Sequence, residues 1–244
     1  MSTNERTQGK SIFLSGASGG IGRATAILLA KQGAKLALMS RSADKLAGVA
    51  DEIVALGGAR PIVIAGDVRR EADCSAAIEQ AISGLGTIDV LINNAGIGIP
   101  TDLSTVATAD LLNMMETNVN GVVYLTRPAL KHMRERKSGH VVMISSRAGL
   151  ESNPTAPLYC ASKFALEGFT EGLRKQADTW RASEGVNIRV SNVRPGNVDS
   201  GYWGTRQVTR EKFMTCDEVA SALAWVIDAP ASMNVVELSL ESRR

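Results

Sequence analysis

The sequence predicts an α/β fold, in which a doubly wound sheet of seven mostly parallel strands carries helices on both faces. Short apolar runs alternate with helical patterns along the chain, and this alternation implies right-handed crossovers between parallel strands. The runs are almost continuous in Val, Ile and Leu, as in strands that are buried on both faces. A glycine-rich turn follows the first run, which makes the expected sheet Rossmann-type.

Each expected strand is a short apolar run bounded by glycine, proline or polar residues. The first two runs, "SIFLS" and "KLALMS", have this form, and so does "HVVMIS" in the middle of the chain. The expected strands are 11–15, 35–40, 61–68, 88–96, 140–145, 186–193 and 235–240.

Each expected helix repeats apolar residues at the spacing of one helix face. The first ends near Gly33 and the second at Gly57-Gly58, where glycine favours a helix stop. The stretch 110–136 is long enough that we expect it to bend. The expected helices are 21–32, 43–56, 71–83, 110–136, 157–181 and 217–227.

No linker, low-complexity segment or short repeat interrupts this alternation. We therefore expect residues 1–244 to form a single dinucleotide-binding domain, with a short substrate lid around residues 197–215.

Composition narrows the classes of function. The 27 basic and 25 acidic residues leave a net charge of +2, which favours neither nucleic acid nor a membrane surface as a partner. The three cysteines form no CxxC pair, so we expect no zinc site, no disulfide framework and a cytoplasmic location. The polar start "MSTNERTQGK" lacks a signal segment. His132 and His140 are expected at the surface without a metal.

The turn "SGASGGIGRAT" places Gly16, Gly20 and Gly22 between the first strand and the first helix. Glycines let the backbone turn tightly and approach a pyrophosphate, which the N–H groups at a helix N-terminus then bind. The alternative is a tight turn with incidental glycines. The position of this turn in the first βα unit favours nucleotide binding.

The end of the second expected strand indicates which nucleotide. An NAD site carries an Asp or Glu there to accept from the ribose 2′-hydroxyl. This chain has Ser40 and Arg41, and the first acid is Asp44. An arginine suits a 2′-phosphate, so we expect NADP(H). Gly19 adds no second cation in the glycine loop, and the alternative is that Arg41 is a solvated surface residue.

Tyr159 and Lys163 lie four residues apart at the start of an expected helix and therefore share one face. A free tyrosine has a pKa of about 10, and a nearby ammonium lowers it. The pair can therefore act as an acid or base near neutral pH. Ser146 follows the fifth strand and can hydrogen-bond a substrate oxygen. Alone, YxxxK is a weak motif that also describes a surface pair. Cys160 is expected to be a packing residue.

In combination these motifs resemble the short-chain dehydrogenase/reductase family over nearly the whole chain. "SGASGGIG" is similar to the family's TGxxxGIG, with Ser15 in place of threonine, and "NNAG" (Asn93–Gly96) is similar to the motif after the fourth strand. "YCASK" is similar to YxxxK, and Ser146 stands thirteen residues before Tyr159, as the family's catalytic serine does. "RPGNVDS" is similar to PGxVxT, with Ser200 in place of threonine.

The resemblance implies reversible hydride transfer between a nicotinamide and a carbonyl/alcohol pair. Tyr159 would donate a proton to the carbonyl oxygen, Ser146 would hold that oxygen, and Lys163 would lower the tyrosine pKa and bind the nicotinamide ribose. "NVNG" is similar to the motif that carries the family's catalytic asparagine, so Asn118 would hold a water of the proton relay. The alternative is an asparagine that hydrogen-bonds the backbone where the helix breaks.

The resemblance and the loop chemistry together imply two further sets of contacts. The expected cofactor contacts are Gly16, Ser18, Gly20, Ile21, Gly22, Ser40, Arg41, Asp67, Val68, Asn94, Ala95, Gly96, Tyr159, Lys163, Pro195, Gly196, Val198 and Ser200. The expected substrate contacts are Ser146, Tyr159, Tyr202 and Trp203.

Three alternative functions share parts of this pattern. A dinucleotide-sensing regulatory protein would keep the fold without turnover, but the catalytic set is intact. An NAD-dependent alcohol dehydrogenase would have the same fold. A sugar-nucleotide epimerase or dehydratase would carry a longer C-terminal substrate domain.

The substrate is expected to be a small carbonyl or secondary alcohol, because the lid is short. Arg147, Arg194, Arg206 and Arg210 are candidates to clamp an anionic substrate, but the favoured interpretation is that they are solvated or paired with acids. The outward apolar positions of helices 110–136 and 157–181 imply a homodimer or homotetramer, since these helices form the four-helix interface of the resembled family.

Overall fold

The computed structural model describes residues 7–99, 102–203 and 208–244. Its strands are β1 (Ser11–Ser15), β2 (Lys35–Ser40), β3 (Ile62–Ala65), β4 (Val90–Asn93), β5 (Ser138–Ile144), β6 (Asn187–Pro195), β7 (Val198–Asp199), β8 (Met214–Thr215) and β9 (Glu237–Leu240). Its α-helices are α1 (Gly20–Lys31), α2 (Ala43–Ala55), α3 (Glu71–Leu85), α4 (Thr108–Met115), α5 (Gly121–Glu135), α6 (Pro157–Glu184) and α7 (Cys216–Asp228).

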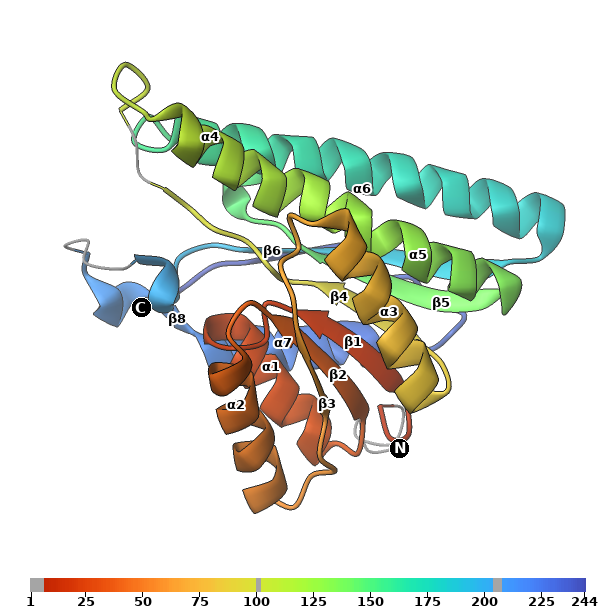
Figure 1. Ribbon diagram of the computed structural model, residues 1–244. Helices are drawn as coiled ribbons and strands as arrows, with labels where there is room; N and C mark the ends of the chain where they lie inside the picture. The colour runs from red at the N-terminus through yellow and green to blue at the C-terminus, as the bar shows by residue number, and fades with distance from the viewer. Residues whose placement is uncertain (1–6, 100–101, 204–207) are drawn as a thin grey trace.

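Seven of the strands form one sheet in the order β3-β2-β1-β4-β5-β6-β9 (Figure 1). The prediction of a doubly wound sheet is confirmed. The sheet was expected to be mostly parallel, and every strand pairing in it is parallel. The strand order reverses between β1 and β4. Ligands of open α/β sheets bind in the crevice at such a switch point, beyond the carboxyl ends of the strands.

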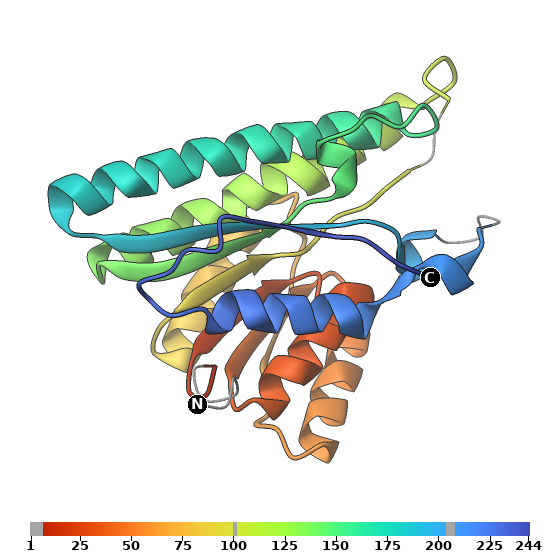
Figure 2. The ribbon, with the colours of Figure 1, turned by 180° about the vertical axis from the view of Figure 1, so that it is seen from behind.

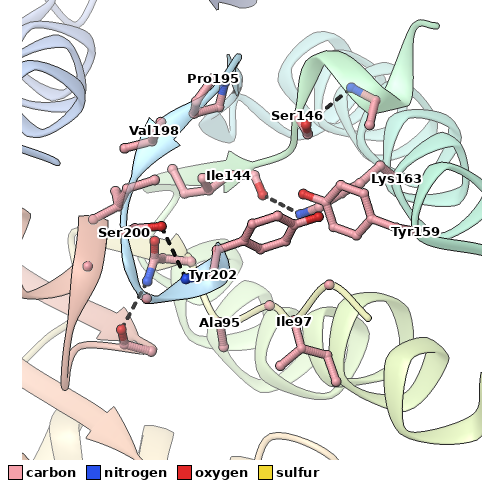
Figure 3. A pocket seen from close by; sticks show the side chains of 18 of the residues that line it. Ala95, Ile97, Ile144, Ser146, Tyr159, Lys163, Pro195, Val198, Ser200 and Tyr202 are labelled. Carbon is pink, nitrogen blue, oxygen red and sulfur yellow. Dashed lines mark hydrogen bonds between the residues drawn. The ribbon is translucent and has the colours of Figure 1, made fainter. Parts of the chain in front are cut away.

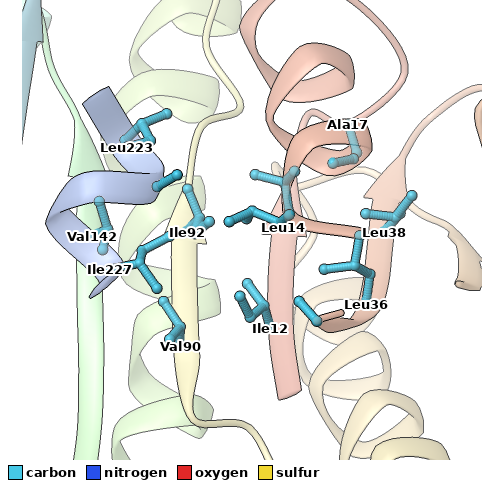
Figure 4. Packing of buried hydrophobic residues seen from close by; sticks show 14 of the residues in the cluster. Ile12, Leu14, Ala17, Leu36, Leu38, Val90, Ile92, Val142, Leu223 and Ile227 are labelled. Carbon is cyan, nitrogen blue, oxygen red and sulfur yellow. The ribbon is translucent and has the colours of Figure 1, made fainter. Parts of the chain in front are cut away.

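Helices cover both faces of the sheet (Figures 1 and 2). One buried cluster joins the sheet to α1, α2 and α7, and a second joins it to α3, α5 and α6. Alternate residues of β1 supply the two clusters: Ile12 and Leu14 face the first, whereas Phe13 faces the second. In Figure 4, Ile12 and Leu14 of β1 lie beside Val90 and Ile92 of β4, with Leu223 and Ile227 of α7 beyond them. This two-faced burial explains why the central strands β1 and β4 are almost continuously apolar.

Several observed elements differ from the expected ones in length or continuity. β3 and β4 are shorter than the runs 61–68 and 88–96. The expected helix 110–136 is divided by a π-helical turn, Glu116–Asn120, between α4 and α5. Strands β7 and β8 pair in a small second sheet through Val198–Met214 and Asp199–Thr215. Two-residue strands carry no alternating pattern, so the sequence does not predict them.

His140 is a correction, because it is buried rather than at the surface. It lies on β5, between β4 and β6, where both faces of the strand are covered. Its Nε2 lies 2.8 Å from Ser191 Oγ, and its Nδ1 lies 3.2 Å from Arg189 Nη2. Burial and the nearby Arg189 hold the pKa of His140 well below its usual value, so the ring is neutral.

No described helix combines the length and the apolar character that crossing a membrane requires. The same described residues bring together no group of three His, Cys, Asp or Glu side chains that suits a metal ion.

Candidate active site

A cavity of about 1430 Å³ opens at the carboxyl edge of the sheet. Segments that follow six of its strands line this cavity, together with the start of α6 and the lid. Most of the predicted site residues lie in it: Gly16, Ser18, Gly20, Ile21, Ser40, Arg41, Asp67, Val68, Asn94, Ala95, Gly96, Ser146, Tyr159, Lys163, Pro195, Gly196, Val198, Ser200, Tyr202 and Trp203. Two of the predicted residues, Gly22 and Asn118, do not line the cavity.

The glycine loop is built for close approach of the backbone. Gly16 has φ +67°, and a Cβ added to it would lie 2.8 Å from Ala95 Cα. A Cβ on Gly22 would lie 2.2 Å from the carbonyl oxygen of Gly16, so Gly22 shapes the loop without touching the cavity. α1 begins after Gly19 with no side-chain cap and no acid in its first turn. Its first N–H groups are therefore left for an anionic ligand, and the loop fits the pyrophosphate of a dinucleotide.

Ser15 and Asn94 tie this loop to the end of β4. The Ser15 hydroxyl accepts from the backbone N–H groups of Asn94 and Ala95, each at 3.1 Å. The Asn94 side chain donates to the carbonyl oxygens of Ser15 and Gly16, at 3.0 and 3.1 Å. Serine supplies the hydroxyl that threonine supplies in the resembled motif.

The end of the cavity beside β2 and α2, where the adenosine was expected, carries two cations. Arg41 and Lys45 line it and are exposed, and neither side chain has a hydrogen bond or an ion pair to a described residue. Sequence reasoning missed Lys45, which lies in the first turn of α2. The Ser40 hydroxyl is engaged locally, donating to the Ser42 carbonyl oxygen at 3.4 Å. Hydrogen bonding from Arg69 holds the pKa of Asp67 below its usual value, so that carboxylate stays ionised.

Ser146, Tyr159 and Tyr202 meet at the other end of the cavity (Figure 3). Ser146 precedes a short 3₁₀ turn, Arg147–Gly149, and its Oγ accepts from the Ala148 N–H at 3.1 Å. Burial raises the pKa of Tyr159 above its usual value, and the charge and hydrogen bond of Tyr202 raise it further. A hydrogen bond with Ser146 lowers it, but burial is the largest cause.

Lys163 is buried, and its Nζ donates to the Ile144 carbonyl oxygen at 3.0 Å (Figure 3). The ammonium lies 5.8 Å from the centre of the Tyr159 ring. Burial lowers the pKa of Lys163 to about 8, and Glu167 opposes this decrease. Burial, the largest cause, raises the pKa of Tyr159 in this structure, and the expected lowering of that pKa by Lys163 stays a prediction.

Asn118 lies in the π-helical turn, with its side chain directed at the loop after β4. Its Oδ1 accepts from Ile97 N, and its Nδ2 donates to Ile97 O, both at 2.8 Å. Nδ2 also lies 3.0 Å from Ser162 Oγ. The side chain therefore makes the backbone contacts of the alternative interpretation. π-helical turns release a carbonyl group from the regular ladder and occur often at functional sites.

The 3₁₀ turn Gly201–Trp203, in the expected lid, places an aromatic stack against Tyr159. The ring centres of Tyr159 and Tyr202 are 5.3 Å apart, and Trp203 and Phe213 continue the stack at 5.2 and 4.8 Å. Trp203 Nε1 donates to the Val198 carbonyl oxygen at 2.7 Å. The lid residues 204–207 lie outside the described residues.

The described arginines that were candidates to clamp an anionic substrate form ion pairs with acidic side chains instead. Arg194 is buried between Glu167 and Glu237, Arg147 pairs with Glu151 and Glu241, and Arg210 pairs with Asp199. These contacts agree with the interpretation that was favoured, in which the arginines pair with acids. Arg206 lies outside the described residues.

Cys160 is buried, as expected of a packing residue. Its Sγ accepts from Asn153 N at 3.1 Å.

A doubly wound sheet with a glycine loop at its switch point, and a serine, a tyrosine and a lysine in the same cavity, defines the class of dinucleotide-binding oxidoreductases. A family model described as short chain dehydrogenase matches residues 10–211. The chain therefore belongs to the short-chain dehydrogenase family.

Individual relatives agree with this assignment. The chain is 34% identical over 241 residues to a protein named as an uncharacterized oxidoreductase from Listeria innocua, with 95% of each chain covered. A short-chain type dehydrogenase/reductase from Mycobacterium marinum superposes with a TM-score of 0.87 at 25% identity, covering 98% of both chains. An alcohol dehydrogenase from Thermococcus sibiricus, solved in complex with 5-hydroxy-NADP, has a TM-score of 0.83 at 26% identity, covering 96% of this chain and 97% of its own.

Proposed function

We propose that this chain is an NADP(H)-dependent oxidoreductase that interconverts a small carbonyl compound and its secondary alcohol. The observation that carries the proposal is that Ser146, Tyr159 and Lys163 line the same cavity as the glycine loop. A regulatory protein that only senses a dinucleotide has no need of a tyrosine, a serine and a buried lysine beyond the nucleotide site.

In this proposal the nicotinamide supplies or accepts the hydride. Tyr159 donates a proton to the carbonyl oxygen in reduction and removes it in oxidation. Ser146 donates a hydrogen bond to the same oxygen, which stabilises negative charge as it develops. Lys163 and Tyr159 hold the nicotinamide ribose, and Pro195, Gly196, Val198 and Ser200 line the nicotinamide end.

Asn118 contributes in this proposal through the π-helical turn. Its side chain fixes the loop after β4, and the turn leaves a backbone carbonyl to hold a water beside Lys163. The proton then has a route from Lys163 to solvent.

The test of function is absorbance at 340 nm with a panel of aldehydes and ketones, both cofactors and both directions. The Tyr159→Phe variant should keep its fold, because only a hydroxyl is lost. Its turnover should fall by ~10²–10⁴-fold, the usual contribution of a positioned acid or base. A wild-type chain that binds NADPH but turns over no carbonyl would support the regulatory alternative instead.

The preference for NADP(H) over NAD(H) is proposed from Arg41 and Lys45. Both cations line the end of the cavity beside β2 and α2 without a hydrogen bond or an ion pair to a described residue, so a 2′-phosphate would break no such contact. The relative from Thermococcus sibiricus was solved with an NADP derivative, which supports the same choice. A hydrogen bond to a charged group contributes ~1.5–3 kcal/mol, so we expect roughly 10- to 150-fold preference.

The measurement is kcat/KM for NADPH against NADH at low salt. Arg41→Ala and Lys45→Ala should each reduce the ratio, and Ser40→Asp with Arg41→Ala should reverse it by adding repulsion. Arg60→Ala is the control, because Arg60 is an exposed arginine paired with Asp51 outside the cavity. A wild-type chain that prefers NADH would make it the NAD-dependent alternative.

The substrate end is apolar and aromatic in this proposal. Tyr202 and Trp203 line this end together with Ser146 and Tyr159, and the Tyr202 ring lies beside the Tyr159 ring. The described arginines of the candidate clamp are ion-paired, so a neutral carbonyl should be used at least as well as its anionic analogue.

We also propose a cytoplasmic homodimer or homotetramer. The three cysteines are free thiols, which suits a reducing compartment. Leu112 of α4 and Phe164 of α6 are exposed on the helical layer that would pair with a second copy. Light scattering should give at least twice the 25.8 kDa of one chain at micromolar concentration.

A further inference from the structure

Glu167 is a partly buried carboxylate on the helix that carries Tyr159 and Lys163. It lies four residues beyond Lys163 and eight beyond Tyr159, so the three side chains follow one stripe of α6. Only 14% of the Glu167 side chain is exposed. Nothing in the proposed chemistry uses it so far.

Three donors from β6 converge on one oxygen of Glu167. Oε2 accepts from Asn192 Nδ2 at 2.7 Å, and from Nε and Nη2 of Arg194 at 3.0 and 2.6 Å. The other side of the guanidinium donates to Glu237 of β9 at 2.7 Å. The Arg194 side chain is 7% exposed, so this is a buried ion pair in which both partners are fixed.

The second oxygen of Glu167 faces the turn that carries Ser146. Oε1 is buried and has no donor among the described residues. A Cβ on Gly149 would lie 2.9 Å from Glu167 Cγ and 3.0 Å from this Oε1. Gly149 ends the 3₁₀ turn that Ser146 begins, and its N–H donates to the Ser146 carbonyl oxygen at 2.9 Å. The Glu167 side chain therefore packs directly against the serine turn.

One side chain thus joins the segments that carry the proposed chemistry. It extends from α6, which holds Tyr159 and Lys163, contacts the turn after Ser146, and binds Arg194, which immediately precedes Pro195. A shift of any one of these segments would disturb its contacts with the others.

Glu167 also affects the charge of Lys163. Burial lowers the pKa of Lys163 to about 8, and Glu167 is the charged group that raises it. The charged groups around Glu167 are Lys163 on its own helix and Arg194 on β6, with Glu237 of β9 behind Arg194. On the serine turn, Arg147 is paired with Glu151 and Glu241.

We propose that Glu167, fixed by Arg194 and Asn192, is a positioning residue that sets the serine turn against α6 and places a negative charge one helical turn from Lys163. The part that concerns catalysis rests on the proposed oxidoreductase function. Arg194 serves in this arrangement as the support of Glu167 and has no contact with substrate.

The first test compares Glu167→Gln with Glu171→Gln. The amide keeps an acceptor for Arg194 and Asn192 but loses the charge. Glu171 is the matched control, because it lies one turn further along α6, is exposed, and pairs with Lys175. We expect kcat of Glu167→Gln to fall by about 10- to 100-fold, as for a small misplacement of reacting groups. KM and the Kd for NADPH should stay within about threefold.

The pH profile separates positioning from a merely structural role. Loss of the Glu167 charge makes Lys163 easier to deprotonate, so the decline of reduction activity at alkaline pH should begin at a lower pH. Glu167→Gln should lower Tm, because the buried Arg194 loses one of its two carboxylate partners and keeps only Glu237. The double variant Glu167→Gln, Arg194→Gln removes this incompletely neutralised cation and should recover part of the lost Tm. It should not recover the wild-type pH profile. If the double variant recovers both, Glu167 is only a structural partner of Arg194 and the proposal is wrong.

A measurement that needs no turnover keeps this proposal independent of the proposed function. The pKa of Lys163 can be followed by side-chain ¹⁵N NMR, with the signal assigned from Lys163→Met. Glu167→Gln should lower this pKa, and Glu171→Gln should leave it unchanged. An unchanged Lys163 titration in Glu167→Gln overturns the proposal even if the wild-type chain reduces no carbonyl. If the titration shifts but no substrate is found, the oxidoreductase function fails and the charge effect of Glu167 stands.

Discussion

The two ends of the cavity are built from different parts of the chain. At the nucleotide end, backbone meets backbone: Gly22 lies against the carbonyl oxygen of Gly16, and the N–H groups of α1 face the cavity. At the substrate end, side chain meets backbone: the Tyr202 ring lies on Gly98, and its neighbours are the rings of Tyr159 and Trp203. The first end is fixed by the sheet, whereas the second depends on the lid.

Two glycines make this difference measurable, because a Cβ would come almost equally close to its neighbour at each. At Gly22 the nearest atom is a backbone oxygen at 2.2 Å, and at Gly98 it is a ring carbon of Tyr202 at 2.1 Å. A backbone atom in a packed turn cannot move without the strand that carries it. A ring on a half-buried lid can turn away.

The largest effect is therefore expected for Gly22→Ala. The added methyl group also lies 2.7 Å from Asn94 Nδ2, so both the glycine loop and its tie to β4 must shift. We expect the free energy of unfolding to fall by about 3 kcal/mol. In a chain of this size that lowers Tm by roughly 6–12 °C. NADPH affinity should fall with it, as measured by calorimetry.

Gly19→Ala controls for a change of glycine in the same loop. Nothing lies within 4 Å of a Cβ at Gly19, so Tm should stay within the shift that about 0.5 kcal/mol gives. Equal Tm values for the Gly22→Ala variant and the wild type would show that the nucleotide end is not rigid.

Gly98→Ala should give the opposite division between stability and activity. The Tyr202 ring can move, so the free energy of unfolding should change by less than about 1 kcal/mol. The displaced ring no longer lies correctly beside Tyr159, and kcat/KM for the carbonyl should fall by about tenfold. Thermal unfolding and steady-state kinetics on the same preparation measure both effects.

The control here is Gly201→Ala, in the same lid as Tyr202 but with nothing within 4 Å of its Cβ. It should match the wild type in both measurements. A Gly98→Ala variant as unstable as Gly22→Ala would remove the contrast between the two ends.

The same contrast decides how much the sequence could predict. Backbone requirements produce local sequence patterns. The spacing of Gly16, Gly20 and Gly22 predicted the loop, and apolar runs predicted the strands of the main sheet. The four-residue spacing of Tyr159 and Lys163 predicted a shared helix face, because α-helical geometry fixes it. The structure brings these groups into one cavity.

Contacts between side chains that are distant in the sequence produce no local sequence pattern. The pair Glu167–Arg194 joins residues 27 positions apart on different elements, so Arg194 was available to the sequence only as a candidate clamp. His140 has the polarity of a surface residue and is buried because β5 lies in the middle of the sheet. Lys45 reaches the cavity because α2 begins beside it, which the helical pattern alone does not specify.

The smallest expected effect tests how the lid acts on the acid/base group. Tyr202 raises the pKa of Tyr159 by its charge and by a hydrogen bond, whereas Ser146 lowers it. Tyr202→Phe keeps the ring on Gly98 and removes the hydroxyl, so the pKa of Tyr159 should fall. Alcohol oxidation needs ionised Tyr159 as the base, and its rising limb should therefore move to lower pH. One neutral hydrogen bond contributes about 1 kcal/mol, which corresponds to about fivefold more activity on that limb.

Tyr124→Phe is the control, because it removes a hydroxyl from α5 outside the cavity, and it should leave the pH profile unchanged. A limb that moves to higher pH in Tyr202→Phe would mean that the Tyr202 hydroxyl donates a hydrogen bond to ionised Tyr159 and lowers its pKa.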